Sequence, residues 1–139
     1  MDPLAPKVWV DAFGATDIGR VRKQNEDNFL MVNLQSPQER VGKQQLHWQV
    51  GARGLLFGIC DGMGGAAAGE VASQMAVDIV VDACADMEPG VPPQTFAKKL
   101  DLAIQQANQA IHYYSCQESY RKGMGTTISV VGLYANLAF

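Results

Sequence analysis

Short apolar runs separated by polar or glycine-rich breaks fill the first part of the chain. Val8–Thr16 and Asn28–Asn33 are rich in Val, Phe, Leu and Met, which predicts two strands, and Leu46–Val50 predicts a shorter third. Leu55–Cys60 is a continuous apolar run that stops abruptly at Asp61. This pattern is typical of a buried strand that delivers an acid into a glycine loop.

Two longer stretches in the middle of the chain have the composition of helices. Ala67–Met87 is rich in Ala, Val and Met and has few charges, which predicts a mostly buried helix that Glu88–Pro93 breaks. A second helix is expected to begin near Thr95, as its N-cap. Its apolar residues recur with a period of about 3.6 and form one stripe: Phe96, Leu100, Ile104, Ala107 and Ile111.

Strand composition returns after a glycine break. Thr126–Tyr134 is β-branched and predicts a strand, and Ala135-Asn136 predicts a turn into a last strand, Leu137–Phe139. Strands, then two helices, then strands favour an α+β fold with helices packed on antiparallel sheet over alternating βαβ units. Because the residues remain apolar up to Phe139, we expect a sheet cut in its middle and exposed apolar surface.

Composition and charge narrow the function classes. The 139 residues allow one domain, and 47% hydrophobic against 18% charged residues provide enough material for a packed core. The net charge of -3 and a basic cluster no longer than Arg20–Lys23 argue against nucleic-acid binding. No apolar run reaches the about 20 residues of a membrane helix, so a cytoplasmic protein is expected.

The three cysteines, Cys60, Cys84 and Cys116, form no Cys-x-x-Cys pair, which favours neither a disulfide framework nor a zinc site. Each is flanked by apolar or helix-forming residues. We therefore expect buried free thiols in a reducing compartment.

Asp61 and the glycines after it form the first candidate site. An ionised carboxylate at the end of an apolar strand needs a partner, because burying it alone is costly. Asp61 and the Gly62 carbonyl offer two oxygens side by side, and oxygen ligands are what Mg²⁺ and Mn²⁺ prefer. An Asp that caps the following loop or helix is the competing interpretation, and this segment alone does not decide. The glycine spacing disfavours a dinucleotide site, and the lack of Gly-Lys-Ser/Thr excludes a P-loop.

Glu26 and Asp27 form the second candidate site. Adjacent carboxylates repel, so placing both in one site makes sense mainly around a shared cation. Arg22 precedes Asp27 by five residues, and its guanidinium group suits the outer oxygens of a phosphate. A solvated turn of mixed charge is the competing interpretation, and on these residues alone it is favoured.

Together these segments resemble the type 2C metal-dependent protein phosphatases (the PPM family) and look closest to its bacterial branch. Thr16–Asp27 resembles the first family motif, Phe57–Gly65 with Gly69–Ser73 the second, and Gly123–Thr127 the third. The motifs stand in the family's order, and the likeness runs from about Asp11 to the end of the chain.

The resemblance implies an antiparallel β-sandwich flanked by helices, in α-β-β-α layers, incomplete at its C-terminus. Residues 1–139 would be the N-terminal portion of a single phosphatase domain. The implied activity is the hydrolysis of phosphoserine and phosphothreonine in proteins by water activated between two Mg²⁺ or Mn²⁺ ions. The implied partner is a phosphorylated protein, for which a Ser/Thr kinase would be the source.

Residue roles follow from the resemblance. Asp27 and Asp61 would be metal-ligand carboxylates, which requires them to lie side by side. Gly62 would contribute its carbonyl to the metal, and Glu26 would act through a metal-bound water. Arg22 would hold the substrate phosphate, so the implied catalytic residues are Arg22, Asp27 and Asp61.

Two further positions complete the comparison with the family motifs. Gly125, Thr126 and Thr127 match a motif whose implied role is mainly structural. Ala66 stands where some family members carry a histidine, which argues against an acid–base imidazole at this position.

The family's later motifs, a Gly-Asp-Ser-Arg-like segment and further aspartates that complete the metal pair, have no counterpart before Phe139. Two divalent cations carry more charge than Glu26, Asp27 and Asp61 neutralise, so we expect this chain alone to be inactive or weakly active. Two alternatives stay open. One is a non-catalytic phosphatase-like binding or sensor module, and the other is an unrelated α+β domain in which Asp61-Gly62 is a simple turn.

Overall fold

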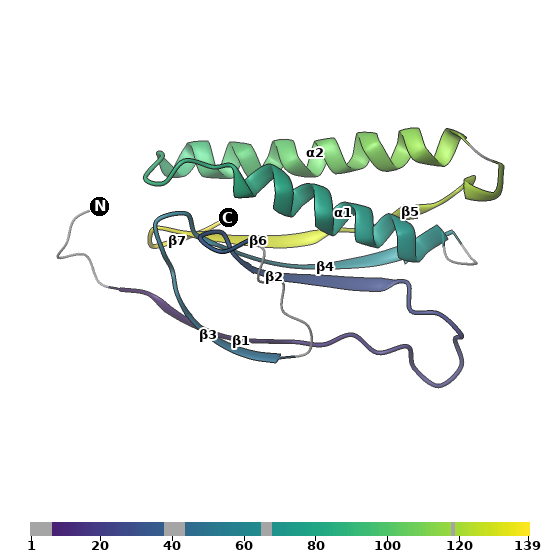
Figure 1. Ribbon diagram of the computed structural model, residues 1–139, viewed down its shortest axis with the longest axis horizontal. Coiled ribbons are helices and arrows are strands. Elements are labelled where there is room, and N and C mark those ends of the chain that lie inside the picture. The colour runs from purple at the N-terminus through teal and green to yellow at the C-terminus, as the bar shows by residue number, and fades with distance from the viewer. Residues whose placement is uncertain (1–6, 38–43, 65–67, 118) are drawn as a thin grey trace.

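Three layers make up the protein in a computed structural model that describes residues 7–37, 44–64, 68–117 and 119–139 (Figure 1). A layer of two helices covers one face of a five-stranded sheet, and a two-stranded sheet lies against the other face (Figure 1). The expected α+β class is confirmed, and three of the four expected layers are present in these residues. The elements are β1 (Trp9–Gly14), β2 (Asp27–Asn33), β3 (Gln44–Gln49), β4 (Leu55–Met63), α1 (Ala68–Ala85), α2 (Pro93–Gln117), the short 3₁₀ helix η1 (Ser119–Arg121), β5 (Gly125–Thr126), β6 (Ser129–Tyr134) and β7 (Leu137–Ala138).

β4 is the central strand of the larger sheet. The order is β2-β4-β6-β7, β5 also pairs with β4, and all pairings are antiparallel. Gly62 of β4 lies opposite Thr126 of β5, and Ile59 lies opposite Ser129 of β6. Since both pairings follow one register, β5 and β6 are a single strand line interrupted at residues 127–128. The expected continuous strand Thr126–Tyr134 is therefore corrected to two pieces.

The core lies between the larger sheet and the helices. Alternate residues of β2 and β4 point into it, among them Leu30, Val32, Leu56 and Cys60. Burying a large apolar side chain of this kind contributes about 1.5–3 kcal/mol. The predicted stripe of α2 faces the same core: Phe96, Leu100, Ala107 and Ile111 are buried, and Ile104 is partly buried.

Two predicted boundaries differ from the structure. α2 begins at Pro93 and not at Thr95, because Pro lacks an N–H and has a φ suited to the first helical position. The N–H groups of Thr95 and Phe96 both donate to the Pro92 carbonyl, so Thr95 lies inside the first turn. β4 continues past Cys60 to Met63, because β2 pairs with Asp61 on one side and β5 pairs with its last two residues on the other.

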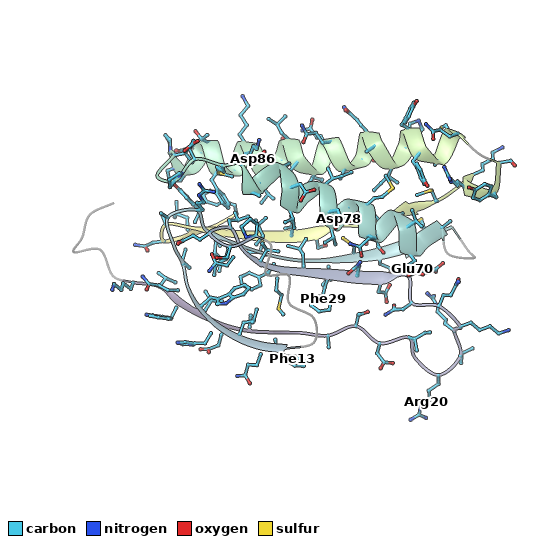
Figure 2. The ribbon with its side chains drawn as sticks, in the orientation of Figure 1. Phe13, Arg20, Phe29, Glu70, Asp78 and Asp86 are labelled. Atoms are coloured by element: carbon cyan, nitrogen blue, oxygen red, sulfur yellow. The ribbon has the colours of Figure 1, made fainter. Side chains whose placement is uncertain are left out.

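An apolar groove of about 620 Å³ lies between the two sheets. Phe29 extends from β2 into this space, and Phe13 lies on β1 below it (Figure 2). Phe13, Ile59 and Val131 are 65%, 66% and 46% exposed, so the expected exposed apolar surface is present. In the described part of the chain, no helix is long and apolar enough to span a bilayer.

The cysteines fall into two classes. Cys60 and Cys84 are buried, and burial raises the pKa of each thiol to about 11. Cys116 is exposed, which corrects the expectation of three buried thiols: it lies in the last turn of α2, beyond the buried stripe.

We predict that a maleimide labels one thiol of the native chain at pH 7. The thiolate is the reactive form, and the two buried thiols titrate only near pH 11, so raising the pH to about 9 should add no second label. Intact mass spectrometry would count the labels, with the Cys116→Ser variant as the unlabelled control and the unfolded chain as the triply labelled one. Two labels on the native chain would contradict the burial of Cys60 and Cys84.

Candidate metal and phosphate site

Strand register brings Asp27 and Asp61 together. β2 and β4 pair with these two residues directly opposite each other. In the adjacent pair the Gly62 N–H donates to the Glu26 carbonyl at 3.2 Å, so the aspartates occupy a position without main-chain bonds between them. At such positions the Cα atoms lie about 4.5 Å apart and the side chains share one face of the sheet. Both aspartates line a cleft of about 400 Å³ that Thr16, Asp17 and Thr127 also line.

The two carboxylates repel each other without compensation from their neighbours. Like charges directly opposite on an antiparallel pair are destabilising. Within the described ranges, neither Asp27 nor Asp61 has an ion pair or a side-chain hydrogen bond with another residue. A cation in the cleft would remove this repulsion, because it would be attracted to both groups.

The donor set suits a hard divalent cation. Exposed carboxylate oxygens are the ligands that Mg²⁺ and Mn²⁺ favour, with water completing the coordination. No group of three His, Cys, Asp or Glu side chains is close enough to hold a metal ion among the residues described. The residues present therefore fit one cation held by two carboxylates.

Glu26 faces away from this cleft. Asn28, two residues further on, donates to Gln74 of α1 at 2.7 Å, which shows that even-numbered positions at this end of β2 face the helices. The Glu26 carboxyl group accordingly lies against Gly69 in the first turn of α1, where the helix dipole favours a negative charge. The expected grouping of Glu26 with the aspartates is therefore not found in the structure.

Arg22 also lies outside the cleft lining. Its Nη1 is 3.5 Å from the Glu26 Oε2, and its side chain is 65% exposed. The loop that carries it joins β1 to β2 at the end of the molecule where α1 begins (Figure 1). Arg20 projects from the tip of the same loop, away from both sheets (Figure 2).

Gly62 owes its identity to packing. A Cβ at this position would overlap the carbonyl oxygens of Gly69 and Glu26. Only glycine therefore lets the first turn of α1 lie directly against β4. The sequence pattern suggests glycines that let a ligand approach, whereas at Gly62 the structure shows the close approach of a helix backbone. Gly65 and Ala66 lie outside the described residues.

The third motif holds Asp61 from the side opposite β2. The Thr127 N–H and the Thr126 hydroxyl both donate to the Asp61 carbonyl, at 2.9 and 3.0 Å. The Asp61 N–H in turn donates to the Thr127 Oγ1 at 3.2 Å. Both polar groups of the Asp61 peptide unit are thus fixed by two consecutive threonines.

Asn25 and Thr16 anchor Asp27, and the sequence patterns considered above do not single out either residue. The Asp27 N–H donates to the Asn25 Oδ1 at 3.1 Å, and the Asn25 Nδ2 donates to the Thr16 Oγ1 at 2.8 Å. An Asn side chain that accepts from the N–H two residues on is a recognised turn motif. Asn25 just before a predicted strand is therefore the signal that points to this anchor.

No family model matches the chain. It is 34% identical over 113 residues to the serine/threonine phosphatase stp of Listeria monocytogenes, covering 81% of this chain and 38% of that protein. It is 35% identical over 116 residues to the serine/threonine protein phosphatase PstP of Mycobacterium tuberculosis, covering 84% of this chain and 18% of that protein.

The fold agrees with these relatives. The structure of the Streptococcus agalactiae (S. agalactiae) serine/threonine phosphatase matches 91% of this chain with a TM-score of 0.70 and 26% identity. The chain belongs to the bacterial type 2C (PPM) phosphatase family. Another member of the family, the catalytic domain of PstP in complex with two manganese ions, matches 93% of this chain with a TM-score of 0.58 and 29% identity.

The chain spans less than half of the type 2C relatives that it matches. It covers 38% of the Listeria protein, 45% of the S. agalactiae chain and 44% of the manganese-bound chain. Metal dependence is thus supported by a manganese-bound relative, while the chain's own described residues supply two opposed carboxylates.

We predict that Gly62→Ala destabilises the fold by about 1–3 kcal/mol, because the new Cβ has to push α1 away from β4. Gly125→Ala is the matched control on the neighbouring strand, since its nearest neighbour would be the Met63 Cγ at 3.7 Å, an ordinary contact. Its unfolding free energy should stay within about 0.5 kcal/mol of the wild type. Urea unfolding without metal measures both, and equal effects of the two substitutions would contradict the packing role of Gly62.

Proposed function

We propose that this chain supplies metal-ligand carboxylates of a protein serine/threonine phosphatase that hydrolyses phosphoserine and phosphothreonine. The observation that carries the proposal is the direct opposition of Asp27 and Asp61 in one cleft, without a compensating charge from the described residues. Family membership supports the same activity, since the relatives are named serine/threonine phosphatases. We place the protein in the cytoplasm, with a kinase-phosphorylated protein as its substrate.

Mg²⁺ or Mn²⁺, when bound, supplies an activated water and positive charge for the phosphate. Asp27 and Asp61 bind on one face of the sheet and fix the position of the charge. The Gly62 carbonyl adds an oxygen from the next residue of β4. Glu26 would act from the opposite face through water, at a distance that its contact with α1 sets.

Arg22 would hold the substrate phosphate. Its present partner is Glu26, in an ion pair with a highly exposed guanidinium group, and such surface pairs contribute only about 0–1 kcal/mol. A phosphate offers a doubly charged acceptor for the same guanidinium fork, so exchanging Glu26 for the substrate is favourable. The loop position of Arg22 leaves its side chain free to turn toward the cleft.

A binding or sensor module is the second candidate. The observation that favours it is the limited donor set: no third His, Cys, Asp or Glu joins the two aspartates within the described residues. Two carboxylates neutralise one divalent cation and leave a second one uncompensated. A protein that binds one cation and a phosphoprotein without turnover would have this composition.

Calorimetric titration with Mn²⁺ tests the metal site. We expect the wild-type chain to bind Mn²⁺ and both Asp61→Asn and Asp27→Asn to weaken binding by at least the 10–100-fold, approximately, that outer-sphere substitutions cost. Asp101→Asn, on the exposed side of α2, is the matched control and should bind like the wild type. Unchanged Mn²⁺ binding in Asp61→Asn would remove the site.

The same variants give a second result of opposite sign without metal. Asp61→Asn removes the repulsion from Asp27, so it should stabilise the metal-free chain by about 0.2–1 kcal/mol. Thermal unfolding in the presence of a chelator measures this, and Asp101→Asn is again the control. A loss of stability in Asp61→Asn would mean that its carboxylate has a partner within the protein.

Phosphate release from a phosphothreonine peptide separates enzyme from sensor. The chain is assayed alone and fused to the region of the Listeria relative that it does not match, each with Mn²⁺. Release by the fusion that Asp61→Asn abolishes supports the phosphatase. Mn²⁺ and peptide binding by a folded fusion without any release supports the sensor.

A further inference from the structure

The strand beside Asp61 is irregular at one residue. The shared register of β5 and β6 on β4 puts Thr127 opposite Asp61. Two residues in this type of antiparallel position normally exchange two main-chain hydrogen bonds. Only one of them forms here, from the Thr127 N–H to the Asp61 carbonyl at 2.9 Å.

A side chain replaces the missing main-chain acceptor. The Asp61 N–H donates to the Thr127 Oγ1 at 3.2 Å and not to the Thr127 carbonyl. That carbonyl has turned away and accepts from the Thr126 hydroxyl at 2.9 Å. The interruption of the strand between β5 and β6 lies at this exchange of acceptors.

Irregularities of this kind re-aim side chains next to functional sites. The rotation of the Asp61 peptide unit decides where its Cβ and carboxylate point, and both polar groups of that unit are held by Thr126 and Thr127. The Thr127 side chain also lines the same cleft as Asp27 and Asp61. Its hydroxyl is thus in the position to set the geometry between the two carboxylates.

We propose that Thr127 is a positioning residue for the metal site. Its hydroxyl accepts the Asp61 N–H in place of its own carbonyl, and this turns the Asp61 carboxylate into the cleft opposite Asp27. The proposal rests on the proposed metal site, to which it adds a residue that does not itself bind the metal. Because Thr127 is exposed, its hydroxyl contributes little to the core, and its loss should change metal binding more than folding.

Three variants of the 139-residue chain test the role of the hydroxyl. Thr127→Val keeps the branched shape and removes the hydroxyl, Thr127→Ser keeps the hydroxyl, and Ser115→Ala removes a hydroxyl that bonds to the His112 carbonyl within α2, away from the cleft. Mn²⁺ affinity is measured by calorimetry, free and bound Mn²⁺ by electron paramagnetic resonance, and the fold by thermal unfolding in chelator.

We expect Thr127→Val to weaken Mn²⁺ binding about 10-fold, which is typical for a residue that orients a ligand. Thr127→Ser and Ser115→Ala should bind like the wild type, and all three should unfold near the wild-type temperature. If Mn²⁺ binds the wild type and not Asp61→Asn, yet binds Thr127→Val unchanged, the positioning role is wrong and the metal site stands. Equal weakening by Val and Ser, or weakening that follows a lower unfolding temperature, also overturns the role. If the wild type binds no Mn²⁺, the metal site falls and the positioning role falls with it.

Discussion

The register between β2 and β4 is the constraint on which the site depends. A slip of one residue would turn Asp27 toward the helices and Leu30 out of the core. Burying side chains such as Leu30 and Val32 contributes about 1.5–3 kcal/mol each, whereas opposing two like charges on paired strands costs about 0.2–1 kcal/mol. The core therefore fixes the register, and the aspartates are held together against their own repulsion.

The surroundings of Asp61 convert this register into a defined geometry. On one side β2 presents Asp27, and on the other Thr126 and Thr127 take both polar groups of the Asp61 peptide unit. Behind the strand, Gly62 admits the first turn of α1 at a distance that no side chain permits. The three segments that match the family's motifs thus meet at one residue pair, although they are far apart in the chain.

Much of this arrangement follows from the sequence, and the rest depends on contacts that leave no local pattern. The apolar stripe of α2 is visible in the sequence, because each element has its own period. The end of β4 is not, since Asp61 to Met63 are strand only through pairing with β2 and β5. Glu26 and Asp27 look like one site because they are adjacent, yet alternation along a strand turns neighbours to opposite faces. The hydroxyl of Thr127 gives no sign in the sequence that it replaces a carbonyl.

Charge balance connects the geometry to the proposed function. Two opposed carboxylates compensate a single divalent cation, and the manganese-bound relative, of which this chain covers 44%, holds two ions. Any second ion near Asp27 and Asp61 would bring back the excess charge in the opposite sign, so it requires acids beyond the two in this cleft. On the proposed function, the described residues therefore set where the first ion lies, and further carboxylates are required for the second. The same reasoning makes a one-ion sensor the natural outcome wherever those further acids are missing.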